Sequence, residues 1–365
     1  MWGIGSDPDL STYWTFKGGT SIKKCYIETW RFSEDLDFSI IPGGPNNPKT
    51  IEPIIKRILD RVHSESNIDF FIKPPLFKHT DKYLYTGGRI YYRGPRNAPA
   101  AAIKLDLSGS EKIVCPTVLQ AISHPYSDGL LQPARVRCYS FAEVFAEKLR
   151  AMGERSRPRD LYDIVLLFRL NSTQMEPKLI KEVLKNKCAT KGIAIPVLEA
   201  VQNTAIRNKL VSEWKNMLGH QLQALPPFED FWQELSNIFN WLNEAYKPPF
   251  LTNIPVEKEQ KTVWSPPPTI WKWGLGIPLE SVRFAAVNHL CVELKYKGNS
   301  NSNFVVEPYS LRKTPDGNLV LYGIDTSTEE VKSYLINNIQ SIKVTTKTFK
   351  ARYKIEFSSV VATTR

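Results

Sequence analysis

Polar and apolar residues alternate along the segment 33–40. Neighbouring side chains of a β-strand point to opposite faces of a sheet, so this alternation divides the segment into two faces. The polar face carries Ser33, Asp35, Asp37 and Ser39, and the apolar face carries Leu36, Phe38 and Ile40. The pattern predicts a strand that presents two carboxylates, which can converge on hard cations such as Mg²⁺.

A second alternation runs over residues 101–108. Ile103, Leu105 and Leu107 alternate there with Lys104, Asp106 and Ser108. If this strand lies beside the first, Asp106 joins Asp35 and Asp37, and three carboxylates are the side chains that two-metal catalysis requires. Taken alone, the segment favours an ordinary surface aspartate at position 106.

Helical periodicity and short alternations continue up to residue 245. Apolar residues at helical spacing predict helices over 20–29, 51–65, 176–187, 204–219 and 228–245. Strands are predicted over 68–72, 82–85 and 89–93, with Thr86-Gly87-Gly88 as the hairpin turn between the last two. Loops are predicted over 41–50 and 116–139.

A further helix is predicted to begin after Ser140, because Ser140 and Glu143 match a capping box. Its apolar stripe consists of Phe141, Val144, Phe145, Leu149 and Met152. Lys148 falls inside this stripe, whereas Glu143, Glu147 and Arg150 are expected on the opposite face. A buried lysine is costly unless a negative charge meets it, so a carboxylate or a triphosphate is expected at Lys148. A snorkelling side chain is the alternative.

This helix is expected to end at Gly153, and Pro158 is expected to lie in the first turn of the next one. Asp160 and Asp163 then lie near its start, where the helix dipole favours negative charge. Capping of the helix is therefore a structural explanation for both. Asp160 shares a side with Ile164 and Leu167, so we expect it to be the more buried of the two.

Gly18-Gly19-Thr20-Ser21 precedes the first predicted helix. Backbone N–H groups at the start of a helix attract phosphate, although an ordinary turn between loop and helix explains the motif as well. A phosphate-binding loop that is followed by a carboxylate pair favours a nucleotide-handling site.

The formal charge of +11 over 365 residues favours an anionic partner such as RNA or a nucleotide, and a solvated basic surface is the alternative. Five scattered cysteines without a Cys-x-x-Cys pair indicate reduced thiols, not disulfides or a zinc site. No apolar run reaches membrane-spanning length, and the first residues do not resemble a signal peptide. We therefore expect a cytoplasmic protein without a membrane partner.

The predicted organisation has four parts. An α+β core over residues 1–115 is followed by a helical subdomain over 116–245 that completes the site. A proline-rich linker over 246–272 is expected to be stiff and extended. In residues 273–365 a short helix is predicted at 280–288, and strands at 291–296, 303–307, 319–324, 330–336 and 353–357, which suggest a small barrel.

The motifs up to residue 245 resemble the AbiEii/AbiGii toxin family of nucleotidyltransferases. The resemblance is carried by Phe-Lys-Gly-Gly-Thr-Ser at 16–21, Lys24, Arg-Phe-Ser-Glu-Asp-Leu-Asp at 31–37, Lys-Leu-Asp-Leu-Ser at 104–108, Glu-Lys-Leu-Arg at 147–150 and Arg-Pro-Arg-Asp-Leu-Tyr-Asp at 157–163. These motifs follow the family's order. Relatives usually have a helical segment before the Gly-Gly loop, and only residues 1–15 precede it here, so we expect a trimmed fold or a true start upstream.

The resemblance implies a DNA polymerase β-type fold with a mixed sheet, two Mg²⁺ ions, and transfer of a nucleotide from an NTP to an acceptor such as the 3′ end of tRNA. It also implies a toxin of a toxin–antitoxin or phage-defence system, with a cognate antitoxin protein. The implied nucleotide-binding residues are Gly18, Gly19, Thr20, Ser21, Lys24, Arg31 and Ser33. The implied metal ligands are Asp35, Asp37 and Asp106, and Lys148 and Asp160 complete the catalytic set. Arg150, Arg155, Arg157 and Arg159 form a basic run next to the site that is expected to contact RNA.

Residues 273–358 are similar to a WYL domain, a small Sm/SH3-like barrel that senses ligands or nucleic acids. The similarity is carried by Val-Glu-Leu-Lys-Tyr at 292–296, Val-Glu-Pro-Tyr-Ser-Leu at 306–311 and the segment 317–325. The naming tripeptide is replaced by Leu319-Val320-Leu321, and the later strand lacks its arginine. Two hypotheses follow: an Mg²⁺-dependent nucleotidyltransferase toxin acting on RNA or protein, or an inactive nucleotidyltransferase scaffold that acts as a regulatory or nucleic-acid-binding module.

Overall fold

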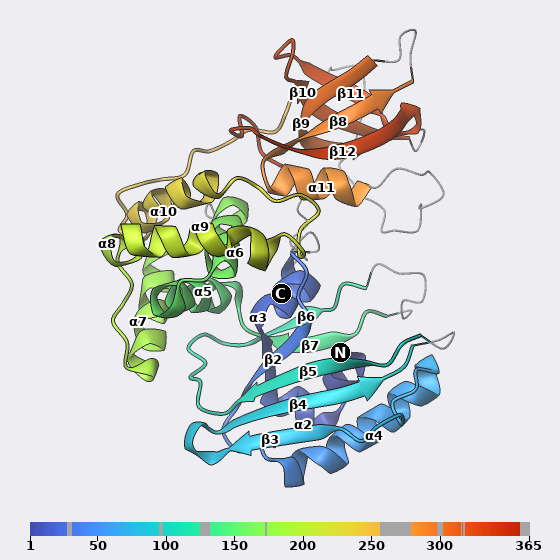
Figure 1. The fold of residues 1–365 in the computed structure, drawn as a ribbon, viewed down its shortest axis with the longest axis vertical. Helices are drawn as coiled ribbons and strands as arrows, with labels where there is room; N and C mark the ends of the chain where they lie inside the picture. The colour runs from blue at the N-terminus through green and yellow to red at the C-terminus, as the bar shows by residue number, and fades with distance from the viewer. Residues whose placement is uncertain are drawn as a thin grey trace.

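A computed structural model describes residues 1–365 except 28–30, 95–97, 125–131, 172–173, 256–278, 298–301, 315, 317 and 358–365. Most of the predicted linker therefore lies outside the described residues. The described chain forms a mixed sheet, a helical region and a second sheet, which follow one another from bottom to top in Figure 1.

The first sheet has seven strands in the order β3-β4-β5-β2-β1-β7-β6. The strands are β1 (Trp14–Lys17), β2 (Asp35–Ile40), β3 (Leu76–Thr80), β4 (Tyr85–Tyr92), β5 (Ala101–Ser108), β6 (Val118–Ala121) and β7 (Arg135–Cys138). The β2–β5 and β1–β7 pairs are parallel, and the other pairs are antiparallel. The predicted strand at 101–108 and its pairing with the first strand are both confirmed.

Short helices flank the N-terminal strands, and one long helix follows them. They are α1 (Trp2–Gly5), α2 (Pro8–Tyr13), α3 (Gly18–Ser21), the π-helix η1 (Ile22–Tyr26) and α4 (Pro48–Ser66). The predicted helix at 20–29 thus begins earlier, at Gly18, directly after β1. Figure 1 shows α4 lying along the β3–β4 side of the sheet.

Three predictions in this region are wrong. The hairpin turn lies at residues 81–84, with η2 (Asp81–Tyr83) in it, and Gly87 and Gly88 lie inside β4. Segment 68–72 makes only an isolated bridge, from Asp69 to Arg93. Segment 116–139 contains strands β6 and β7, which the sequence pattern did not distinguish from loop.

The helical region follows the predicted order. Its helices are α5 (Phe141–Arg155), α6 (Pro158–Asn171), α7 (Pro177–Lys191), α8 (Leu198–Val201), α9 (Thr204–Leu218) and α10 (Phe228–Leu242). Helix α5 continues past Gly153 to Arg155 and is ended by Ser156, whose φ of 47° is left-handed. Glu143 and Arg150 are buried instead of exposed, because α7 packs on their side of α5.

The second sheet is antiparallel, with the order β11-β10-β9-β8-β12. It consists of β8 (Leu290–Tyr296), β9 (Ser302–Lys313), β10 (Leu319–Asp325), β11 (Val331–Leu335) and β12 (Ile339–Thr348), with α11 (Leu279–Val287) before it and the short η4 (Ile336–Asn338) before β12. Among the described strands β11 and β12 are edges, so no closed barrel is formed. The predicted strand at 353–357 is wrong, and β12 was not predicted.

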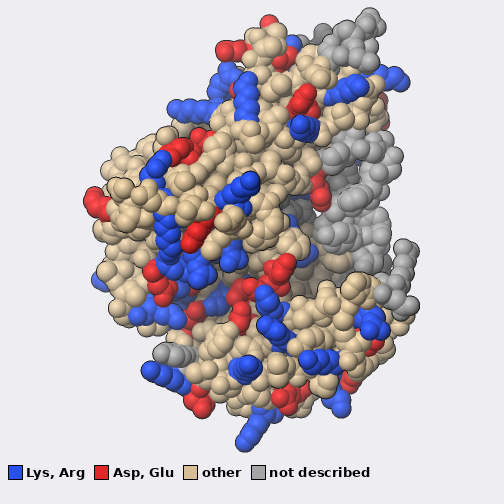
Figure 2. All heavy atoms as spheres, in the orientation of Figure 1, with Lys and Arg blue, Asp and Glu red and all other residues tan. Residues whose placement is uncertain are grey.

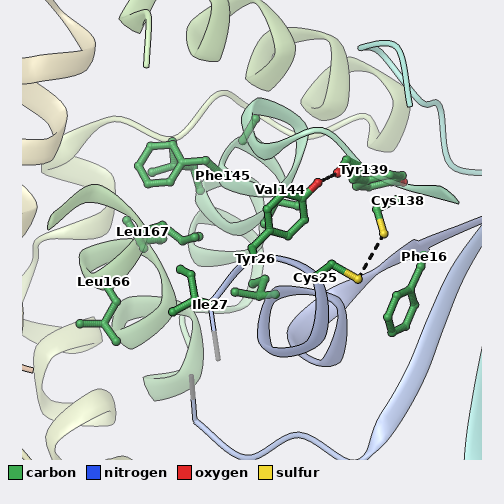
Figure 3. Close-up of a cluster of buried hydrophobic side chains, with 14 of the residues drawn as sticks. Phe16, Cys25, Tyr26, Ile27, Cys138, Tyr139, Val144, Phe145, Leu166 and Leu167 are labelled. Atoms are coloured by element: carbon green, nitrogen blue, oxygen red, sulfur yellow. Dashed lines mark hydrogen bonds between the residues drawn. The ribbon is translucent and has the colours of Figure 1, made fainter. Parts of the chain in front are cut away.

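The first sheet and the helical region share one hydrophobic core. Figure 3 shows part of it, where Tyr26 and Cys25 of η1 meet Tyr139, Val144 and Phe145. All five cysteines are free thiols, as predicted, although Cys25 and Cys138 have their sulfur atoms 3.5 Å apart. Within the described residues, no helix is both long and apolar enough to cross a membrane.

Candidate functional site

The sheet brings together the carboxylates of two neighbouring strands. Asp37 of β2 and Asp106 of β5 are direct partners in the parallel register, and Asp35 is the partner of Lys104. Because every second residue faces the same side, the three carboxylates share one face, as predicted. Burial, assisted by the charges of Asp106 and Asp35 and opposed by Lys17 and Lys148, raises the pKa of Asp37 to about 6.

Two of the three carboxylates already have partners in the chain. The Nζ atom of Lys104 lies 3.4 Å from Oδ1 of Asp35, and the hydroxyl of Tyr85 donates to Oδ1 of Asp106. No group of three or more acidic, His or Cys side chains within the described residues is arranged to hold a metal ion by itself. An ion at this site would therefore need phosphate oxygens, water or both in addition to the carboxylates.

The donor set nevertheless suits a hard cation. Carboxylate oxygens are the ligands that Mg²⁺ prefers, usually one or two of them together with phosphates and water. Oδ1 of Asp35 is buried and makes no hydrogen bond within the described structure beyond its ion-pair contact with Lys104. Burial, together with the like charges of Asp106 and Asp35, raises the pKa of Asp37. A cation between these groups would relieve both costs.

Gly18 is required where it stands, because its backbone passes directly over Asp37. Its φ of 76° is left-handed, and a Cβ added there would overlap Oδ2 of Asp37. The next residues hold the turn in place, since Thr20 Oγ1 donates to the Asp35 carbonyl at 2.6 Å and Ser21 Oγ donates to the Gly18 carbonyl at 3.1 Å. The predicted phosphate loop and the predicted carboxylates thus lie in direct contact.

Arg31 and Ser33 close the other side of this turn. A Cβ added at Gly19 would lie 2.9 Å from Ser33 Oγ and 3.0 Å from Arg31 Nη2. The hydroxyls of Thr20 and Ser33 are 3.0 Å apart. These residues, predicted to bind nucleotide, therefore surround Gly19. Lys24 points elsewhere, with its Nζ atom 3.4 Å from the Ser123 carbonyl.

Asp163 is the charge that meets the buried lysine. Lys148 Nζ lies 2.7 Å from Asp163 Oδ2, and Arg31 binds both oxygens of the same carboxylate at 2.7 and 2.8 Å. Burial alone would raise the pKa of Asp163, but Arg31 and Lys148 outweigh it and hold the pKa below its usual range. A carboxylate, a triphosphate and snorkelling were the explanations considered for Lys148; the carboxylate is confirmed, and the largely buried side chain does not snorkel.

Asp160 lies beside this cluster and pairs with a different residue. Both of its oxygens accept from Arg155 at 2.8 Å. The prediction that Asp160 is more buried than Asp163 is wrong, because both are fully buried. The carboxylate that the fold aims at Lys148 and Arg31 is Asp163, so the role predicted for Asp160 has its closest structural counterpart one helical turn later.

Some arginines of the basic run at 150–159 form ion pairs with acidic side chains, and others are free to face solvent. Arg150 is buried and pairs with Glu147 and Glu154, and Arg155 is held by Asp160. Arg157 is exposed. Arg159 is partly buried, and burial together with the positive charge of Arg31 lowers its pKa.

Several site residues were not predicted. Lys17 stands opposite Asp37 in the β1–β2 pair and forms a largely buried ion pair with Glu111. The sequence feature that could have pointed to Lys17 is its position directly before Gly18. Tyr85, Glu111 and Gln221 come from distant segments, and no pattern along the chain connects them to the carboxylates.

The face in Figure 2 shows how these charges lie on the surface. Acidic and basic side chains gather together at the junction between the mixed sheet and the helical region. Elsewhere on this face the charges are scattered. The junction is also where β2, α5 and α6 bring their site residues together.

Comparisons with known proteins agree with the sequence resemblance. The family model described as nucleotidyl transferase AbiEii toxin, Type IV TA system, matches residues 3–236. MenT4, a nucleotidyltransferase toxin from Mycobacterium tuberculosis, is 17% identical with a TM-score of 0.47, over 67% of this chain and 80% of that one. JHP933 from Helicobacter pylori is 17% identical with a TM-score of 0.43, over 67% of this chain and 87% of that one. No curated protein matches the chain.

Proposed function

We propose that this protein transfers a nucleoside monophosphate from an NTP to an RNA acceptor. The basis is its family, because the chain belongs to the AbiEii nucleotidyl transferase toxins. The 3′ end of tRNA is the preferred acceptor class, and a protein hydroxyl is the other. The observation that supports the proposal is the contact between Gly18 and Asp37, since it puts the Gly18–Ser21 turn directly beside the paired carboxylates of Asp37 and Asp106. A cognate antitoxin and a cytoplasmic location belong to the same proposal.

Asp35, Asp37 and Asp106 are the residues that would hold Mg²⁺, with two ions expected. When bound, Mg²⁺ neutralises phosphate charge and favours ionisation of the attacking hydroxyl. The pKa of Asp37, about 6, leaves this carboxylate ionised at neutral pH and ready to bind a cation.

The chain's own groups would then orient the two reactants. The turn Gly18–Ser21 is proposed to hold the triphosphate, with Arg31 and Lys148 supplying positive charge beside it. The acceptor hydroxyl oxygen attacks the α-phosphorus while the bond to the bridging oxygen of pyrophosphate breaks. The hydroxyl proton passes to Asp106, whose Oδ1 is held by Tyr85 and whose Oδ2 is proposed to receive it. Catalysis by such a site is mainly positioning and charge stabilisation.

The test is incorporation of labelled NTPs into RNA and protein in the presence of Mg²⁺. Wild type is expected to label RNA, and Asp37→Asn is expected to lose this activity by at least about a hundredfold. The matched control is Asp81→Asn, because the side chain of Asp81 is 98% exposed and lies outside the site. Failure of wild type to label any RNA or protein, together with unchanged toxicity of Asp37→Asn in cells, would overturn the proposal.

The second candidate function is an inactive scaffold that binds nucleic acid. It is favoured by the contacts that two of the carboxylates already make: Lys104 pairs with Asp35, and the hydroxyl of Tyr85 donates to Asp106. Calorimetry separates the two functions. Mg²⁺-dependent NTP binding that disappears in Asp35→Asn supports the enzyme, whereas NTP-independent RNA binding that this substitution leaves unchanged supports the scaffold.

The division into parts at residues 115, 245 and 272, and the assignment of residues 273–365 to a WYL-like domain, also stand as proposals. The five-stranded antiparallel sheet after α11 is compatible with such a domain. Limited proteolysis of the full chain tests the division, and the first cut is expected within residues 246–272.

A further inference from the structure

The loop between α9 and α10, residues 219–227, reaches the segment that closes the proposed nucleotide site. The side-chain oxygen of Gln221 accepts from Arg31 Nη1 at 3.0 Å. The backbone carbonyl of the same residue accepts from the N–H of Phe32 at 3.1 Å. One loop residue therefore holds both the guanidinium of Arg31 and the backbone that follows it.

The neighbours of Gln221 connect this loop to the second sheet. Leu222 packs against the core of the mixed sheet and also against the core of the C-terminal sheet. Ala224 packs against the C-terminal core alone. The loop thus rests on the core that α11 and the C-terminal sheet form together, while Gln221 holds Arg31.

A separate contact connects the C-terminal region to Asp163. The hydroxyl of Tyr162, the residue before Asp163, donates to Asn288 Oδ1 at 2.9 Å in a buried position. Asn288 is itself held, because its Nδ2 donates to the Phe284 carbonyl at 2.9 Å. Asn288 directly follows α11, whose Val287 packs in the first core while Phe284 packs in the second. In Figure 1, α11 lies between the C-terminal sheet and the rest of the chain.

We propose that Gln221 and Tyr162 are positioning residues of the transferase site, and that α11 and the C-terminal sheet together hold both of them in place. This inference rests on the proposed function. It adds one point: the proposed nucleotide site also depends on contacts from the α9–α10 loop and the C-terminal region, which lie outside the strands that carry the carboxylates. The physical reason is that Arg31 and Asp163 form one bidentate pair, and each partner is fixed by a different contact that leads to the C-terminal region.

The first experiment measures steady-state kinetics with the full chain. Gln221→Ala leaves Nη1 of the buried Arg31 with one acceptor fewer, and we expect the KM for NTP to rise about tenfold while kcat changes little. Gln221→Glu keeps an acceptor oxygen and is expected to restore the wild-type KM. Gln223→Ala is the control, since Gln223 is an exposed residue of the same loop. Equal KM values for Gln221→Ala and Gln223→Ala, or failure of the glutamate to restore the KM, would overturn the role of Gln221.

The second experiment removes a single hydroxyl. Tyr162→Phe keeps the ring stacked on Phe231, at 5.3 Å between centroids, and removes the hydroxyl that contacts Asn288. We expect the KM for NTP to rise about fivefold. Tyr334→Phe is the control, because Tyr334 is also buried and lies in the C-terminal sheet, but its hydroxyl has no hydrogen-bond partner within the described structure. Indistinguishable KM values for the two variants would contradict the proposal.

The third readout does not depend on activity. Amide hydrogen exchange at Phe32 reports whether the α9–α10 loop keeps its contact with this segment, because the Phe32 N–H donates to the Gln221 carbonyl. We expect Leu222→Ala to speed the exchange about tenfold, and Leu225→Ala, which packs against the first core only, to leave it close to wild type. Equal exchange in both variants overturns the link to the C-terminal sheet. A wild type without any transfer activity overturns the proposed function instead, and the exchange result then still decides the link.

Discussion

At the scale of single residues, the proposed site depends on positions where a small change in a side chain would disturb the arrangement of its charged groups. Gly18 is such a position, because its left-handed backbone lies against Asp37. Asp163 is another, because it is the shared partner of Arg31 and Lys148. Asp163 is fully buried and Gly18 is partly buried, so their substitution should affect folding as well as activity.

Gly18→Ala should lose activity and stability together. The left-handed backbone disfavours any residue with a Cβ by about 1–2 kcal/mol, and the added Cβ would displace the Asp37 carboxylate. We expect a lower melting temperature and loss of NTP transfer. Gly192→Ala is the matched control, because its φ is 65° and nothing lies within 4 Å of the added Cβ. If both variants keep wild-type transfer, the contact between Gly18 and Asp37 is not part of the site.

Asp163→Asn should change the dependence of stability on pH. A carboxylate with a lowered pKa contributes stability that is complete above the pKa of the unfolded chain, about 3.9, and is lost as the pH falls through the lower folded-state pKa. Arg31 and Lys148 lower the pKa of Asp163 against the effect of burial. Wild type should therefore lose stability more steeply than Asp163→Asn below about pH 4.

At neutral pH, Asp163→Asn is expected to cost about 3–5 kcal/mol of unfolding free energy, because two buried cations lose their counter-ion. Asp160→Asn should cost less, since its partner Arg155 is half-exposed and can turn to water. Urea denaturation at a series of pH values measures both effects. Parallel pH profiles for wild type and Asp163→Asn would contradict the assignment.

At the scale of elements, helix α5 shows how one helix start serves both folding and the site. Ser140 Oγ accepts from the Glu143 N–H at 3.3 Å, which is half of the predicted capping box. The Glu143 carboxylate does not return to Ser140. It accepts from the N–H groups of Val114 and Cys115 and pairs with Lys187 at 2.6 Å. This anchoring fixes the rotation of α5 and with it the direction of Lys148.

Substitutions at this helix start should therefore differ in cost. Ser140→Ala removes a cap and is expected to cost about 1 kcal/mol. Glu143→Ala leaves Lys187 without its closest counter-ion and two backbone donors without an acceptor, which is expected to cost about 3–5 kcal/mol. The control is Ser64→Ala on the exposed side of α4, where alanine suits a helix. Chemical denaturation ranks the three, and equal costs for Ser140→Ala and Glu143→Ala would contradict the anchoring role.

At the scale of the whole molecule, the formal charge of +11 is available to RNA only where it is not used internally. In the basic run near the site, Arg150 and Arg155 are engaged in ion pairs, whereas Arg157 is exposed. The net charge therefore overstates the positive surface beside the site.

RNA binding provides the corresponding prediction. Each phosphate contact contributes to the decrease of log K with log salt concentration, so Arg157→Ala should lower the magnitude of this slope by about 1. Arg150→Ala should act through stability instead, because its guanidinium is held by Glu147 and Glu154. Filter binding of tRNA at several salt concentrations measures the slope, with exposed Lys56 of α4 as the control position. An unchanged slope for Arg157→Ala would remove this residue from the RNA surface.

The residue patterns by themselves determined much of this protein. Alternation placed Asp35, Asp37 and Asp106 on polar strand faces, and the apolar stripe of α5 marked Lys148 as a lysine that needs a partner. These are local properties, because strand and helix periods act over a few neighbouring residues. Family motifs added the expected chemistry, and the family itself is shown by the match over residues 3–236.

Only the tertiary structure decided which partner each charged group has. Asp163 instead of Asp160 meets Lys148, Gly87 and Gly88 lie inside β4, and Lys17, Tyr85 and Gln221 join the site from segments that share no pattern with it. The second sheet also remains open among its described strands, whereas a barrel was predicted. The physical reason is that ion pairing and strand order depend on which surfaces pack together, and that packing is set by the whole buried core.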